Sequence, residues 1–146
     1  MKTIIAVDFD GTIAEHKYPD IGRPIPGAFH WLKKFKDAGA VLILWTMRSD
    51  EGGNGSTLTE AVEFCQTNGI EFYGINENPT QRSWTTSPKA YAHVYIDDAA
   101  FGCPLIESKE LGARMMVDWD KVGPAVMERI IWTRFSLLML GLTTWK

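Results

Sequence analysis

The sequence contains few cysteines and no basic run, and each scarcity narrows the range of functions. Cys65 and Cys103 are its 2 cysteines, too few for a disulfide scaffold and without the spacing of zinc ligands. We therefore expect reduced thiols in a cytoplasmic protein. Lysine and arginine number 15 against 18 aspartates and glutamates, for a net charge of −3. This balance does not indicate a nucleic-acid surface, although a local basic patch would keep that option open.

Long apolar runs are also missing. The first apolar run is short and leads directly into Asp8, so no signal peptide is expected. Segment 130–145 falls short of the roughly 18 uninterrupted apolar residues of a membrane span, and it contains Arg134. We therefore expect no membrane partner, and a single domain over residues 1–146.

Short runs of branched apolar residues predict β-strands. Segments 3–8 (TIIAVD) and 41–46 (VLILWT) are almost continuously apolar, which is typical of parallel strands covered on both faces. Similar runs predict three further strands, at 70–75, 93–97 and 113–117.

Segments whose apolar residues recur with helical spacing lie between these strands. One helix is expected over 26–39 and a second over 56–69, capped by Ser56 or Thr57, and the C-terminal helix spans about 121–142. The alternation predicts an α/β fold, a Rossmann-like three-layer sandwich with a mainly parallel central sheet of about five strands.

Two carboxylates, Asp8 and Asp10, follow the first strand one residue apart. The sequence Asp10-Gly11 is a common turn dipeptide, but a turn does not explain an acid at the end of a buried strand. The strand at 41–46 also ends in a polar residue, and Asp97-Asp98 follow another strand. Ligands of open parallel sheets bind beyond the carboxyl ends of the strands, and clustered carboxylates suit magnesium.

These residues together resemble the motifs of the haloacid dehalogenase superfamily. DFDGTI (8–13) is similar to the first motif, and Thr46 matches the hydroxyl of the second. Lys89 matches the lysine of the third motif and Asp97-Asp98 the acidic fourth, in the order of the family. The resemblance covers about residues 1–100 and implies a magnesium-dependent phosphatase with a HAD-like core.

The resemblance also implies roles for the acidic residues. Asp8 would be the nucleophile that forms an aspartyl-phosphate, and Asp10 would protonate the leaving group and then activate water. Magnesium would be held by the Asp8 side chain, the Asp10 carbonyl and Asp97. Asp98 would act directly or orient a metal-bound water. Dehalogenases of the superfamily lack the acid at the position of Asp10, so its presence favours phosphoryl transfer.

Other residues would bind the phosphoryl group. The resemblance assigns this role to Thr46 and Lys89, assisted by backbone N–H groups at Met47 and Gly11. Arg48 is interpreted in two ways, as a contact to the phosphate or leaving group or as a solvated loop arginine.

The gaps at 14–26 and 76–91 are too short for the cap domain that small-metabolite phosphatases of this superfamily usually carry. An open site suits a macromolecular substrate or a lid from another subunit. Loops 15–25 and 48–56 would form its rim, where His16, Lys17 and Arg23 are interpreted as surface residues.

Several alternatives stay open at this stage. The substrate could be a polynucleotide end, a nucleotide, a sugar phosphate or a phosphoprotein. A non-enzymatic switch of the receiver type is the competing function, but its phosphorylated aspartate would end the third strand, where Gly74-Ile75-Asn76 stands. The apolar C-terminal helix is expected to cover a sheet face, and a homo-oligomer interface is the alternative.

Overall fold

The computed structural model describes residues 2–110 and 114–141. Its centre is a four-stranded parallel sheet in the order β3-β2-β1-β4. The strands are β1 (Ile4–Val7), β2 (Val41–Leu44), β3 (Gly74–Ile75) and β4 (Val94–Ile96). The predicted α/β class and parallel sheet are thus confirmed, with four strands in place of five.

The expected fifth strand belongs to a separate hairpin. β6 (Met115–Val117) pairs antiparallel with β5 (Leu105–Glu107), with Leu105 opposite Val117. β5 had not been predicted, and residue 113 of the expected strand lies outside the described residues. β6 forms a hairpin with β5 because the two strands are close in sequence: Glu107 lies opposite Met115, eight positions later.

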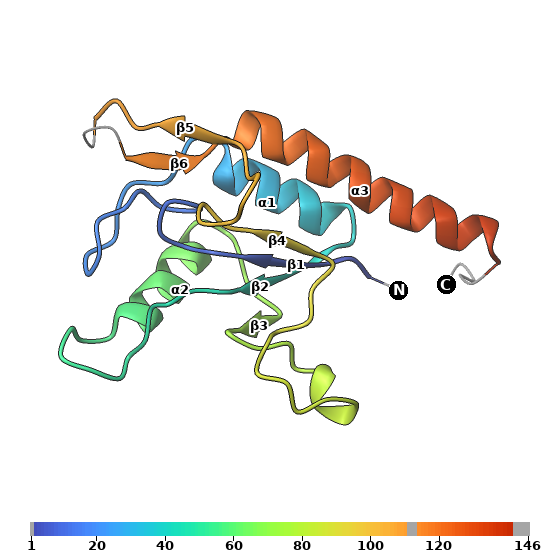
Figure 1. Ribbon diagram of the computed structural model, residues 1–146, viewed down its shortest axis with the longest axis horizontal. Coiled ribbons are helices and arrows are strands. Elements are labelled where there is room, and N and C mark those ends of the chain that lie inside the picture. The colour runs from blue at the N-terminus through green and yellow to red at the C-terminus, as the bar shows by residue number, and fades with distance from the viewer. Residues whose placement is uncertain (1, 111–113, 142–146) are drawn as a thin grey trace.

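The helices form the outer layers of the sandwich. They are α1 (Ala28–Asp37), α2 (Thr57–Thr67) and α3 (Trp119–Met139), and a 3₁₀ turn, η1, covers Gln81–Ser83. Helices α1 and α3 lie on one face of the sheet and α2 on the other (Figure 1). The side chains of Ile5, Val7, Ile43 and Leu44 are therefore buried, which explains the continuous apolar runs.

The start of α2 is capped from a distant position. Ser56, the residue before the helix, makes no capping hydrogen bond through its side chain, and the Thr57 hydroxyl donates to the Ser49 carbonyl. Instead, Asp50 Oδ1 accepts hydrogen bonds from the N–H groups of Leu58 and Thr59. Ser56 thus occupies the predicted N-cap position, but the capping oxygen comes from Asp50, because the loop folds back and brings this carboxylate to the N-terminus of the helix.

The first half of α3 packs on α1. Gly123 permits this contact, because a Cβ atom there would lie 2.2 Å from the Trp31 ring. Trp119 is buried and its Nε1 donates to the Thr12 carbonyl at 2.7 Å, which connects α3 to the loop after β1. The helix thus supports the loop that carries the first acidic motif.

The second half of α3 carries exposed apolar side chains. Ile130 is buried, but Trp132 is 65% exposed and Phe135 56%. Leu142 and Trp145 lie outside the described residues, and a homo-oligomer through this helix stays a prediction. Within the described ranges, no helix has both the length and the apolar character that crossing a membrane requires.

Candidate functional site

The loop after β1 folds into a tight turn that presents Asp8. The N–H groups of Ile13 and Ala14 donate to the Phe9 carbonyl, and the Gly11 N–H donates to the Ala14 carbonyl. Gly11 has φ +80°, a conformation that side-chain-bearing residues rarely adopt. The predicted close turn at Gly11 is therefore present, but its N–H group is already used within the loop.

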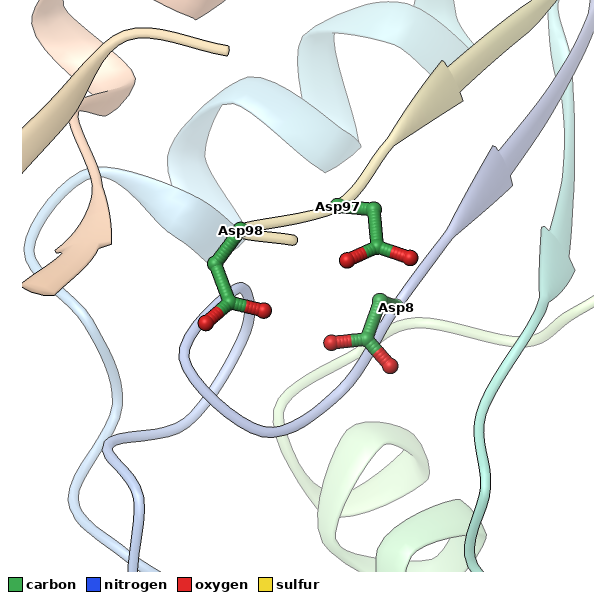
Figure 2. Close-up of side chains that lie close together, drawn as sticks. All are labelled: Asp8, Asp97 and Asp98. Carbon is green, nitrogen blue, oxygen red and sulfur yellow. The ribbon is translucent and has the colours of Figure 1, made fainter. Parts of the chain in front are cut away.

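Three carboxylates converge at the carboxyl ends of β1 and β4 (Figure 2). One oxygen from each of Asp8, Asp97 and Asp98 lies within 4.8 Å of the others. Parallel neighbouring strands end at the same edge of a sheet, and β1 pairs directly with β4. The predicted meeting of the two acidic motifs is thus found in the structure.

Thr12 and His16 organise this cluster, and the sequence patterns had given neither of them a role in it. The Thr12 hydroxyl donates to Asp8 Oδ2 at 3.2 Å and accepts from the Asp98 N–H. His16 Nε2 lies 2.9 Å from Asp98 Oδ2. The spacing of Thr12 four residues after Asp8 was visible in the sequence, whereas the His16 contact depends on the path of the loop.

The environment of Asp8 disfavours its charged form. Burial, together with the charges of Asp97 and Asp98, raises the pKa of Asp8 from 3.8 to about 7. Hydrogen bonds from the Phe9 backbone and the Thr12 hydroxyl act in the opposite direction. Asp8 is therefore a carboxylate that a nearby cation would stabilise.

A hollow of about 330 Å³ opens beside Asp8. Its lining residues come from the ends of all four parallel strands: Asp8, Trp45, Thr46, Met47, Asn76 and Asp97. Thr46 and Met47 thus lie where the sequence predicted them.

Asn76 is an additional polar residue of this hollow. Its Oδ1 accepts from the Thr46 N–H at 2.8 Å, and its backbone has φ 51°. It directly follows β3, so the rule that selected Asp8 and Thr46 could have selected it too.

The two cationic residues assigned to phosphate binding lie elsewhere. Lys89 precedes β4, is exposed, and places Nζ 5.4 Å from the centroid of the Tyr95 ring. The Arg48 side chain is only 1% exposed and binds Asp10 through two hydrogen bonds of 2.8 Å. Neither residue lines the hollow. Arg48 is therefore not a solvated loop arginine either.

The donor set fits a divalent cation. The clustered ligands are carboxylates, which magnesium prefers. Within residues 2–110 and 114–141, no lysine or arginine forms an ion pair with Asp8 or Asp97. The described lysines and arginines thus do not compensate these two carboxylates by direct pairing, and burial, the main cause of the raised pKa of Asp8, adds to the cost of its charge.

The chain is similar to a solved structure described as that of a conserved protein from Bacteroides thetaiotaomicron. The two share 36% sequence identity and superpose with a TM-score of 0.70, over 88% of this chain and 93% of the other. No protein-family model matches the sequence, and no curated protein does so either.

Proposed function

We propose that this chain, which belongs to the family of the conserved Bacteroides thetaiotaomicron protein, is a magnesium-dependent phosphatase that acts through an aspartyl-phosphate. The observation that carries the proposal is the convergence of Asp8, Asp97 and Asp98 beside the hollow. A carboxylate with a raised pKa that lines a pocket is a candidate nucleophile.

In the first step an oxygen of Asp8 attacks phosphorus and forms an O–P bond, while the ester P–O bond breaks. Asp10, in its protonated form, gives its proton to the leaving oxygen, which departs as an alcohol, and Asp10 is left as a carboxylate. In the second step Asp10 takes a proton from water, whose oxygen attacks phosphorus. Asp8 leaves as a carboxylate, and inorganic phosphate is released.

Asp8 and Asp97 would hold magnesium through their carboxylates, with Asp98 fixed beside them by His16. The Asp10 carbonyl is the further ligand that the resemblance to the haloacid dehalogenase superfamily implies. When bound, the ion supplies positive charge that offsets the repulsion between the phosphate and Asp8. Its role is large because, among the described residues, no lysine or arginine side chain lines the hollow.

Neutral groups remain to bind the phosphoryl oxygens. Thr46 and Met47 both line the hollow. The Thr46 hydroxyl accepts from the Arg48 N–H and keeps its own proton to donate, and the Met47 N–H makes no hydrogen bond among the described residues. The Asn76 amide nitrogen is a further donor, because its Oδ1 is already used by Thr46. We propose these three donors in place of the predicted set that contained Lys89, Arg48 and Gly11.

The test is hydrolysis of p-nitrophenyl phosphate with magnesium, with EDTA, and with the variant Asp8→Asn. Loss of activity in EDTA and in the variant is the expected result. Asp37→Asn is the matched control, because Asp37 is an exposed carboxylate at the end of α1. Activity that survives in Asp8→Asn would reject Asp8 as the nucleophile.

A non-enzymatic metal- or phosphate-binding protein is the second candidate. This candidate is favoured because no cationic side chain of the described residues lines the hollow. Beryllium fluoride, which mimics a phosphoryl group on a carboxylate, distinguishes the two functions. Capture of this group on Asp8 together with turnover supports the phosphatase, whereas capture without turnover of any ester supports the switch.

A further inference from the structure

Arg48 is the most enclosed charged residue near the site. Its Nε donates to Asp10 Oδ2 and its Nη2 to Asp10 Oδ1, each at 2.8 Å. Its Nη1 donates to the Pro19 carbonyl at 2.9 Å, and Nη2 also donates to the Asp20 carbonyl at 2.8 Å. Both Asp10 oxygens are thus held by one rigid group.

Two aromatic rings enclose the same guanidinium. Its central carbon lies 4.9 Å from the centroid of Phe9 and 5.3 Å from that of Tyr18. The Arg48 side chain is 1% exposed, against 19% for Asp10. A planar group with five donors fits this setting, whereas the ammonium group of lysine could not hold both carboxylate oxygens and both carbonyls in one plane.

We propose that Arg48 is a positioning residue that fixes the orientation of the Asp10 carboxylate and joins the rim loop 15–25 to it. The proposal rests on the proposed function for its catalytic consequence. Arg48 follows β2, Asp10 follows β1, and the two carbonyls belong to the rim loop. One side chain therefore connects the three segments that surround the acid.

The sequence offers a matched control at Arg23. Arg23 also secures the rim loop, through hydrogen bonds to both carboxylate oxygens of Glu15 at 2.7 and 2.9 Å, but it makes no contact with Asp10. Its side chain is 56% exposed. A comparison of Arg48→Lys with Arg23→Lys thus separates the orientation of Asp10 from the attachment of the loop.

The kinetic test compares an alkyl phosphate with p-nitrophenyl phosphate. An alkoxide needs a proton as it leaves and nitrophenolate does not, so a misplaced Asp10 slows the alkyl ester selectively. We expect Arg48→Lys to lower kcat for the alkyl ester about 100-fold, with a much smaller change for the aryl ester. Arg23→Lys should leave the ratio of the two rates unchanged. An equal loss on both esters in Arg48→Lys would overturn the catalytic part of the proposal.

A second measurement does not depend on activity. In NMR spectra the Nε–H proton of Arg48 should exchange with solvent at least about tenfold more slowly than that of Arg82, and Asp10→Asn should speed this exchange. The Arg82 side chain is 81% exposed. Equal exchange at the two arginines would overturn the proposal. If the wild type hydrolyses neither ester, the proposed function fails, while the exchange rates still decide whether Arg48 positions Asp10.

Discussion

His16 Nε2 lies 2.9 Å from Asp98 Oδ2, and this pair occupies the space next to the Gly11 α-carbon. A Cβ atom on Gly11 would be 2.3 Å from the His16 nitrogen and 2.6 Å from the Asp98 oxygen. The turn after β1 therefore needs glycine for two reasons, its positive φ and the closeness of this pair. The second reason connects a backbone position to the acidic cluster.

Gly11→Ala should lower the free energy of unfolding by more than the conformational cost alone, which is about 1–2 kcal/mol. The added methyl group must also displace His16 from Asp98. Gly55→Ala is the control, because Gly55 has φ +78° and a methyl group added to it would meet no other atom within 4 Å. Urea denaturation of both variants measures the difference. Equal losses would show that the His16–Asp98 pair adjusts without cost.

Asp8 makes the stability of the protein depend on pH. Its folded pKa of about 7 exceeds the ordinary value of 3.8, so the unfolded chain releases this proton first as the pH rises. The free energy of unfolding therefore falls between these two pH values, by about 4 kcal/mol in total at about 1.4 kcal/mol per pKa unit.

Asp8→Asn removes this dependence. In EDTA at pH 8 the variant should be more stable than the wild type, and the two should converge near pH 4. Magnesium should stabilise the wild type at pH 8 and have little effect on the variant. Urea titrations at both pH values provide the check, with Asp37→Asn as control. A wild type that is equally stable at both pH values would contradict the prediction.

Asp50 has the opposite dependence. Hydrogen bonds from the Thr59 side chain and backbone lower the pKa of Asp50 below 3.8. The stabilisation that the Asp50 carboxylate gives the folded protein is therefore present above pH 3.8 and is lost as the pH falls through the pKa of Asp50 in the folded state. We expect Asp50→Ala to lower the melting temperature at pH 7 and to have a smaller effect at pH 3. Glu51→Ala, the adjacent exposed acid, should have little effect at either pH.

The two cysteines should differ in reactivity. Cys65 is fully buried, and burial raises its pKa to about 12. Cys103 is only partly buried, although burial also raises its pKa. A thiol reagent at pH 8 should label Cys103 in the native protein and reach Cys65 only after denaturation, because the thiolate is the reactive form. Labelling of native Cys103→Ser would contradict this assignment.

Much of the fold followed from local pattern. The strands at 4–7 and 41–44 lie inside the segments predicted from their apolar runs. A strand that is buried on both faces carries apolar residues at successive positions, so the sequence alone indicates it. The strand expected at 113–117 is present at Met115–Val117, but it pairs with β5 in a hairpin and is not a fifth strand of the parallel sheet. Pairing partners are not encoded in apolar content.

The sequence by itself determined which polar side chains meet at the edge of the sheet. Asp8, Thr46 and Asp97 each follow a parallel strand, and parallel strands in one sheet end at the same edge. Only the tertiary structure decided where the long cationic side chains point. Arg48 turns inward to Asp10, and Lys89 lies over Tyr95. The direction of such a side chain depends on partners distant in sequence, and no spacing along the chain specifies those partners.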